Sequence, residues 1–106
     1  MAPGQTQPLV VGPALDQDGQ PHRLELYMFR ACPYCRRVLS LIERDHIPVS
    51  YRDTHLNPSF RKELLSLTGK AQVPCLFVDG QPLFESAAIM AYLERHFVCK
   101  EPLSDF

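Results

Sequence analysis

Two cysteines, Cys32 and Cys35, lie three residues apart with a proline and a tyrosine between them. A pair at this spacing can bind zinc, form a structural disulfide or cycle between dithiol and disulfide during catalysis. Residues three apart in the first turn of a helix can reach the Cα separation of a disulfide, about 4.4–6.8 Å. The neighbouring residues decide between these uses.

Zinc and a purely structural disulfide have less support in the sequence than redox cycling. A zinc ion takes four ligands, and the remaining candidates form no second closely spaced pair. They are Cys75, Cys99, His22, His46, His55 and His96. A disulfide between the first two cysteines would close a loop too short to restrict much of the unfolded chain. We therefore expect a catalytic pair and no metal, with zinc as the lesser alternative.

Length and composition indicate one compact domain. The chain has 106 residues, of which 45% are hydrophobic and 22% charged, and its net charge is −1. Such a small net charge gives no overall field that would attract nucleic acid or an anionic membrane. The sequence has no apolar run of membrane-spanning length, and its first residues lack the basic and apolar parts of a signal peptide. We expect a cytoplasmic protein without nucleic-acid or membrane partners, in a compartment where structural disulfides are uncommon.

The elements that must position the cysteines begin with a strand, a helix and a second strand. The apolar stretch 23–29 predicts a buried strand that ends just before Cys32. Apolar residues within 33–45 fall on one face of a helix, and 47–52 predict the second strand. Two strands joined by a helix in this way form a right-handed parallel crossover.

The second half of the chain predicts a helix, a hairpin and a last helix. Asn57 followed by proline is typical of a helix start, and Gly69 of its end. Asp79-Gly80 predicts a tight turn between strands at 75–78 and 81–84. Ser86 is expected to cap the last helix.

This order, β-α-β-α-β-β-α, predicts an α/β thioredoxin-like fold with a mixed four-stranded sheet and helices on both faces. Residues 23–98 would form this domain. Residues 1–22, rich in proline and glycine, are interpreted as a flexible N-terminal arm, and 99–106 as a C-terminal tail.

The junction of the first strand and helix gives the two cysteines different roles. Pro33 fits the first helical position, so Cys32 becomes the N-cap and its sulfur faces unpaired backbone N–H groups. This position favours the thiolate, and we expect Cys32 to be the exposed nucleophile. Cys35 lies one turn further on, nearer the core, as the resolving thiol. Three arginines add positive charge nearby: Arg30, Arg36 and Arg37.

Several motifs resemble known families. CPYC after an apolar strand is similar to the glutaredoxin active site, and LLSLTGKAQVPCLFVDG resembles the glutaredoxin helix, TG turn and VP strand. Val73-Pro74 matches the position of the cis-proline of thioredoxin-like proteins. The following FESAAIMAYLERHF resembles the N-terminal domain of glutathione S-transferases instead. The resemblance covers residues 23 to 97.

The resemblance implies a glutathione-dependent thiol–disulfide oxidoreductase with Cys32 and Cys35 as catalytic residues and glutathione as co-substrate. Glu85 and Ser86 would hold the γ-glutamyl end of glutathione, and the Val73 backbone its cysteinyl part. The full set of implied glutathione contacts is Tyr34, Val73, Pro74, Glu85 and Ser86. Implied partners are glutathionylated or disulfide-bonded proteins and, indirectly, glutathione reductase.

Other functions stay open at this point. They are a small reductase served by thioredoxin reductase, a module that binds a glutathione-ligated [2Fe–2S] cluster, and a redox-inert transferase-like interaction module. Glutathione S-transferases carry a second, helical domain for hydrophobic substrates, whereas this sequence stops at Phe106. Conjugation of foreign compounds is therefore not expected.

Overall fold

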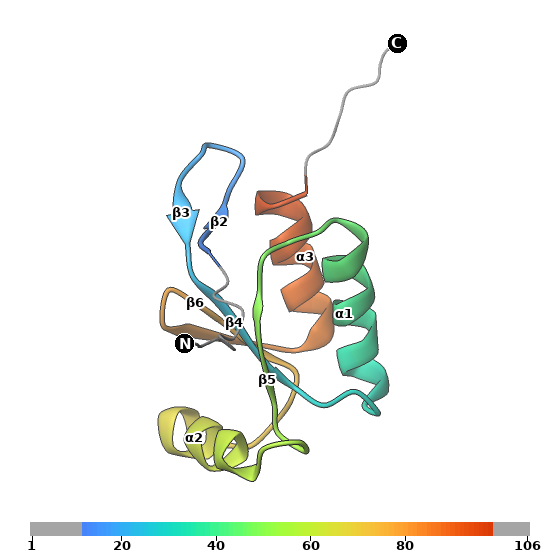
Figure 1. The fold of residues 1–106 in the computed structure, drawn as a ribbon, viewed down its shortest axis with the longest axis vertical. Coiled ribbons are helices and arrows are strands. Elements are labelled where there is room, and N and C mark those ends of the chain that lie inside the picture. The colour runs from blue at the N-terminus through green and yellow to red at the C-terminus, as the bar shows by residue number, and fades with distance from the viewer. Residues whose placement is uncertain (1–11, 99–106) are drawn as a thin grey trace, which may run out of the picture.

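The structure is a computed structural model, and it describes residues 12–98 (Figure 1). Its elements are β2 (Ala14–Leu15), β3 (Pro21–His22), β4 (Leu24–Met28), α1 (Pro33–Arg44), β5 (Ser50–Asp53), α2 (Pro58–Thr68), β6 (Cys75–Val78), β7 (Gln81–Phe84) and α3 (Ser86–His96). From β4 onward their order is the predicted β-α-β-α-β-β-α. No helix within residues 12–98 has the length and apolarity needed to cross a membrane.

The main sheet has four strands in the order β5-β4-β6-β7. Strand β4 pairs in parallel with β5 and antiparallel with β6, and β6 pairs antiparallel with the edge strand β7. Helices α1 and α3 cover one face of this sheet and α2 lies against the other (Figure 1). The prediction of a mixed four-stranded sheet with helices on both faces is confirmed.

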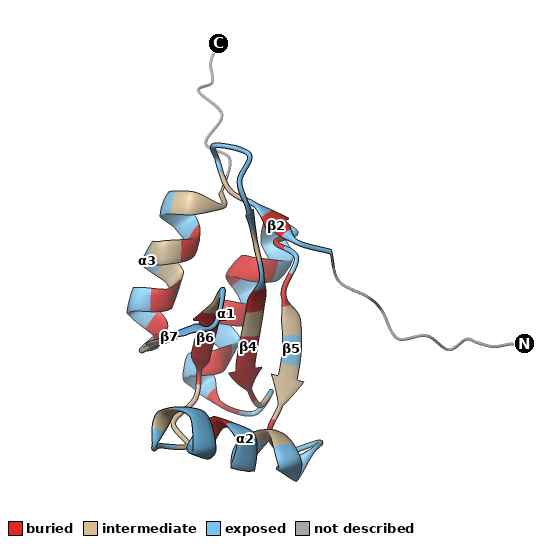
Figure 2. Ribbon diagram, turned by 90° about the vertical axis from the view of Figure 1, so that its left-hand side faces the viewer, coloured by how far each residue is buried: buried red, intermediate tan, exposed pale blue. Residues whose placement is uncertain are grey.

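The core is divided between the two faces. On the α1 and α3 side, apolar residues from both helices meet β4 and β6, with Leu26, Ile42, Leu76 and Ile89 all fully covered. On the α2 side, Leu64 packs with Tyr27 and Phe77. Figure 2 shows the burial concentrated in the central strands β4 and β6. The segment that carries Cys32 follows directly from the buried strand β4.

Local sequence signals account for α2 and for the last hairpin. The Asn57 side chain accepts a hydrogen bond from the Ser59 N–H at 3.1 Å, and Gly69 ends the helix at a φ of 85°. In the turn between β6 and β7, Asp79 and Gly80 have φ values of 51° and 89°. Two positive φ angles are what a two-residue hairpin of this type requires, so the Asp-Gly prediction is confirmed.

The second predicted strand, 47–52, is displaced in the structure. Pairing with β4 extends from Ser50 to Asp53. Ile47 and Val49 are buried in the preceding connection rather than in the ladder. Pro48 between them has no N–H to donate to a neighbouring strand. The alternation of the buried residues Ile47 and Val49 therefore gave the pattern of a strand, although neither residue pairs with a neighbouring strand.

Residues 12–22, interpreted from the sequence as flexible arm, instead contain a short hairpin in the structure. Strands β2 and β3 pair antiparallel, and Ala14 is fully buried in the core. The Gln17 N–H donates to the carbonyl of His96 at 2.9 Å, which joins the hairpin to the end of α3. The rest of the arm and the tail 99–106 lie outside the described residues. The division into arm, domain and tail remains a proposal.

Candidate active site

Cys32 occupies the N-cap of α1, as the sequence predicts. Its backbone is extended, with φ −74° and ψ 121°, and Pro33 is the first helical residue. The Cys32 sulfur accepts a hydrogen bond from the backbone N–H of Cys35 at 3.5 Å, and its carbonyl accepts one from the Arg36 N–H at 2.9 Å. The sulfur thus lies at the end of the helix that favours negative charge.

The two thiols of the pair differ in their surroundings. Cys32 is 8% exposed and Cys35 is 0% exposed. Burial raises the pKa of the Cys35 thiol to about 12, and its hydrogen bond and charge interaction with Cys32 act in the same direction. Cys32 is therefore the more accessible residue of the pair, although it is less open than the exposed nucleophile expected from the sequence, because it belongs to the buried cluster that α1 covers.

A cleft of about 480 Å³ lies between the start of α1, the loop before β6 and the start of α3. We call it the proline cleft. Its lining residues are Tyr34, Arg37, Gln72, Val73, Pro74, Glu85, Ser86 and Ala87. All five predicted glutathione contacts are among them, and the volume suits a small ligand. Neither Cys32 nor Cys35 lines the cleft, but Val73 packs against the buried cluster that contains both cysteines.

The loop before β6 presents an unpaired stretch of backbone to the cleft. The Val73–Pro74 peptide bond is cis, as the resemblance implied. The backbone N–H and C=O of Val73 have no hydrogen-bond partner within residues 12–98. A segment in this state can pair with an extended peptide as a neighbouring strand would.

The start of α3 differs from the prediction. Ser86 was expected to be the N-cap, but Glu85 holds that position and Ser86 is the first helical residue. Glu85 has a φ of 79° and ψ of 122°, and its side chain makes no capping hydrogen bond. The chain turns from β7 into α3 at Glu85, and Ser86 already has helical backbone angles. Its side chain therefore does not occupy the cap position that serine prefers. Non-glycine residues at a positive φ such as that of Glu85 cost roughly 1–3 kcal/mol and are concentrated at functional sites.

Ser86 and Glu85 face the cleft with different partners. Ser86 is 8% exposed and lies in the first turn of α3, where backbone N–H groups are unpaired within the helix. The Glu85 carboxylate accepts a hydrogen bond from the Gln72 side-chain amide at 3.2 Å. The α3 end of the proline cleft therefore combines a carboxylate, a hydroxyl and free backbone donors, which suit a ligand with both an ammonium and a carboxylate group.

Sequence reasoning missed three residues of the proline cleft, namely Arg37, Gln72 and Ala87. A signal existed for the first of these. Arg37 follows Tyr34 by three positions on α1, a spacing that puts both on one face of the helix. Gln72 directly precedes Val73, but only the folded loop brings it to Glu85.

Cys75 is separate from Cys32 and Cys35. It is fully buried on the α2 side of the sheet with Tyr27, Leu64 and Phe77, whereas Cys32 and Cys35 lie in the core on the α1 side. Burial raises the pKa of the Cys75 thiol to about 11. Cys99 lies outside the described residues. Within residues 12–98 no group of three or more histidine, cysteine or acidic side chains is arranged to hold a metal ion.

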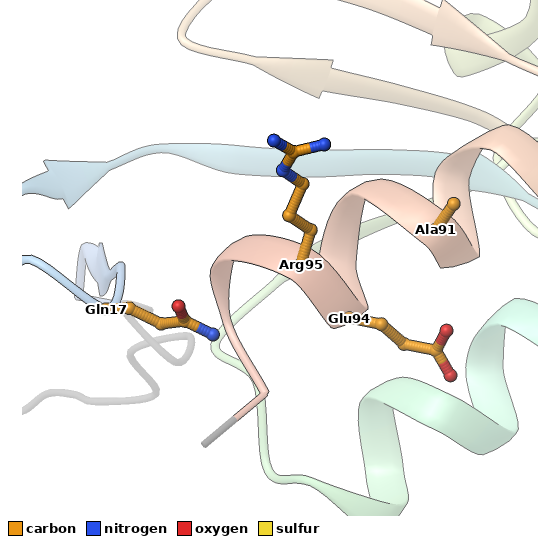
Figure 3. A pocket seen from close by; sticks show the side chains of 4 residues that line it. All are labelled: Gln17, Ala91, Glu94 and Arg95. Atoms are coloured by element: carbon orange, nitrogen blue, oxygen red, sulfur yellow. The ribbon is translucent and has the colours of Figure 1, made fainter. Parts of the chain in front are cut away.

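A second hollow, of about 430 Å³, lies between the β2–β3 hairpin and the C-terminal half of α3 (Figure 3). It is lined by Gln17, Ala91, Glu94 and Arg95. None of these was predicted to do chemistry, and α3 contributes to the proline cleft through its opposite end. This hollow shares no lining residue with the proline cleft.

The fold, with a cysteine pair at the start of its first helix and a cis-proline before β6, defines a protein of the thioredoxin-like class. A family described as "Glutathione S-transferase, N-terminal domain" matches residues 26–101. The chain belongs to this family.

Individual relatives come from two groups. Glutaredoxin 3 of Escherichia coli K12 is 29% identical over 58 residues, which are 55% of this chain and 70% of the relative. Mouse prostaglandin E synthase 2 is 28% identical over 87 residues, 78% of this chain but 22% of that protein. This chain therefore spans less than a quarter of the mouse protein.

Solved structures of transferases share the fold. An epsilon-class glutathione S-transferase from the housefly has a TM-score of 0.60 and 31% identity, over 69% of this chain and 34% of that one. A glutathione transferase homologue from Drosophila mojavensis, solved with bound glutathione, has a TM-score of 0.61 and 28% identity, over 70% and 35%. The chain corresponds to about a third of each.

Proposed function

We propose that this protein is a glutathione-dependent thiol–disulfide oxidoreductase of the glutaredoxin type, with Cys32 as its nucleophile. The observation that carries the proposal is the position of Cys32 at the N-cap of α1, beside a cleft lined by every residue predicted to contact glutathione. The glutaredoxin relative supports a glutathione-related redox function, and the transferase homologue solved with bound glutathione supports glutathione as the ligand.

Glutathione is a tripeptide with one ammonium and two carboxylate groups, and the proline cleft offers a partner for each part. Glu85 pairs with the ammonium, while the Ser86 hydroxyl and the first N–H groups of α3 bind the neighbouring carboxylate. The free Val73 backbone pairs with the cysteinyl residue. Arg37, the cation among the lining residues, receives the glycyl carboxylate.

The reaction consists of two thiol–disulfide exchanges. In the first, the Cys32 thiolate attacks the glutathione sulfur of a mixed disulfide, the disulfide bond breaks, and the target protein leaves as a thiolate that takes a proton from water. In the second, the thiolate of another glutathione attacks the sulfur of the bound one. Oxidised glutathione departs and Cys32 is again a thiolate. Each mixed disulfide therefore consumes one glutathione from solution, which leaves joined to the glutathione removed from the target, as oxidised glutathione.

Cys35 provides the second route. Its thiolate can attack the Cys32 sulfur, which releases glutathione and leaves a disulfide between the two cysteines. Because burial raises the pKa of Cys35 to about 12, this thiol is protonated at neutral pH and must lose its proton to react. Glutathione from solution is therefore the main resolving thiol for glutathionylated substrates. The reaction needs a pool of reduced glutathione, which agrees with the cytoplasmic location expected from the sequence.

The test is reduction of the mixed disulfide of glutathione and mercaptoethanol, coupled to glutathione reductase. Turnover by the wild type and none by Cys32→Ser supports the proposal, with Cys75→Ser as a matched variant that alters a cysteine on the other face of the sheet. Coupling to thioredoxin reductase instead should give no turnover. A wild type inactive with glutathione, or an active Cys32→Ser variant, would contradict the assignment.

A further inference from the structure

We propose that Arg30 and Arg36 form a basic rim beside Cys32 that selects glutathionylated proteins with acidic residues next to the modified cysteine. The inference rests on the proposed function and names its substrate class. It concerns the part of the substrate that the proline cleft does not hold, namely the polypeptide that carries the glutathione.

The two arginines of the basic rim have no ionic partner. Both are exposed, and neither is within an ion pair with any acidic residue of 12–98. Arg23, Arg44 and Arg52 lie close to carboxylates, whereas Arg37, Arg61 and Arg95 have no ion pair within residues 12–98 either. Charge on the basic rim is therefore available to a partner.

The basic rim borders both the nucleophile and the proline cleft. Arg36 and Ser40 are shared by two adjoining hollows on the outer face of α1, of about 220 Å³ and 320 Å³. The larger one also takes in Pro33, the neighbour of Cys32, and Arg37, which lines the proline cleft as well. The hollows thus connect the proline cleft, through Arg37 and Pro33, to the basic rim, with Cys32 directly before Pro33 in the chain.

The charge on this surface is opposite to that of the whole chain. The protein has a net charge of −1, yet three arginines gather beside Cys32. The acidic group facing them is Glu43, which lines the smaller hollow with Arg30 and Arg36. Arg30 also lies over the Tyr51 ring at 5.7 Å, which holds its guanidinium at the surface.

Occupancy of the proline cleft by glutathione determines where the target polypeptide can lie. Its modified cysteine must come to Cys32, while the glutathione fills the cleft, so residues flanking that cysteine lie over the bordering surface. On the α1 side that surface is the basic rim. Acidic flanking residues would be attracted to it and basic ones repelled, and such surface charges act mainly on the association rate.

The experiment uses two glutathionylated peptides that differ only in whether glutamates or lysines flank the cysteine. The kcat/KM of the wild type should be about tenfold higher for the acidic peptide at low ionic strength, and this preference should fall to about twofold in ~0.5 M salt. The ratio between the two peptides is the readout, because any change in the reactivity of Cys32 itself alters both rates equally.

Arg36→Glu should remove or reverse the preference, whereas Arg61→Glu, which makes the same charge change on an exposed position of α2, should retain it. Arg36→Gln should give an intermediate ratio and serves as the second variant if the first does not fold. Equal kcat/KM for both peptides in an enzyme that reduces the mercaptoethanol mixed disulfide would overturn this inference alone. Inactivity of the wild type towards that small substrate would overturn the proposed function and, with it, the basic rim.

Discussion

Helices α2 and α3 begin in opposite ways. At α2 the Asn57 carboxamide oxygen accepts hydrogen bonds from both the N–H and the hydroxyl of Ser59, at 3.1 Å and 2.7 Å. At α3 the cap position is held by Glu85 in a left-handed conformation, and no side chain caps the helix. A capped helix start is stable by itself, whereas an uncapped one keeps its N–H groups available to an anion.

The two helix starts also differ in their position relative to the proline cleft. Helix α2 covers the sheet face opposite Cys32 and Cys35, and its start has no part in the proline cleft. Helix α3 directs its start into that cleft, next to a strained residue with a carboxylate side chain. Helix α1 is intermediate, because its cap is the sulfur of Cys32, a weak acceptor that is also the proposed nucleophile. Breaking each start in turn separates structural caps from functional ones.

The largest effect is expected at the start of α1. Cys32→Ser should lower deglutathionylation by about a hundredfold or more, since serine is a poor nucleophile at neutral pH. Cys35→Ser should keep this activity, because glutathione from solution resolves the intermediate, and should lose most reduction of protein disulfides. Activities are measured with a glutathione mixed disulfide and a protein disulfide, each coupled to glutathione reductase.

Labelling with iodoacetamide at about pH 6 gives an independent check in a Cys99→Ser background. Cys32 should react ahead of Cys35 and Cys75, because burial raises the pKa of both other thiols. If Cys35 were labelled before Cys32, the assignment of Cys32 as the nucleophile would be wrong.

The next largest effect is expected at the start of α3. Glu85→Ala combined with Ser86→Ala should weaken glutathione binding by about 1–3 kcal/mol through loss of charge-assisted hydrogen bonds. Because Ser86 is not the cap, stability should change little. Calorimetric titration with glutathione measures the affinity, and Glu94→Ala, at the other end of α3, is the matched control. Unaltered affinity in the folded double variant would remove both residues from the site.

The sequence predicts those elements whose conformation is set by the preferences of neighbouring residues in the chain. Asn57, Gly69 and Asp79-Gly80 each have a local preference that the fold obeys, so α2 and the last hairpin were predicted at the right residues. The sequence also predicted the Cys32 cap, since Pro33 fixes the first helical position. These residues would favour the same local conformations in almost any context.

Predictions failed where distant segments determine the conformation. Ser86 has the preference of a cap, but the path of the chain from β7 makes Glu85 the cap instead. Hairpin β2–β3 is joined to α3 by a hydrogen bond from the Gln17 N–H to the His96 carbonyl, which no local pattern reveals. Likewise, Gln72 reaches the proline cleft and the Glu85 carboxylate only because the loop before β6 meets the start of α3 in the folded chain.

A smaller effect, on stability alone, is expected at α2. Asn57→Ala should lower the free energy of unfolding by about 1 kcal/mol, the usual value of a helix cap. Glutathione affinity should be unaffected, because this helix start lies outside the proline cleft. Urea unfolding measures the loss, and Asn57→Asp, which keeps an accepting oxygen, should restore most of it. If Asn57→Ala changed glutathione affinity, the start of α2 would not be purely structural.

Glu85→Gly should have the opposite pair of effects to Asn57→Ala, with higher stability and weaker glutathione binding. Glycine adopts a φ of 79° without strain, so the variant should gain up to about 1 kcal/mol of stability after the extra chain entropy of glycine is subtracted. It should also bind glutathione more weakly, because the carboxylate is lost. Glu85→Ala loses the same carboxylate and keeps the strain, so it should bind as weakly and be less stable than Glu85→Gly. Equal stability of the two variants would mean that the left-handed conformation stores no strain.

The smallest effect is expected at the C-terminal end of α3, to which the β2–β3 hairpin is hydrogen-bonded. His22 lies between two carboxylates, with Nδ1 2.6 Å from Asp79 Oδ2 and Nε2 2.8 Å from Asp16 Oδ2. Hydrogen bonds to Asp79 and then Asp16 raise the pKa of His22 above its ordinary value of about 6.5. Folding therefore favours the protonated ring, and the stability it contributes is complete below that ordinary value and is lost as the pH rises through the raised one. The difference in melting temperature between the wild type and His22→Asn should accordingly be larger at about pH 5.5 than at about pH 9, with glutathione affinity at neutral pH unchanged. The same difference at both pH values would show that the ring holds the hairpin by packing against Phe97 rather than by its charge.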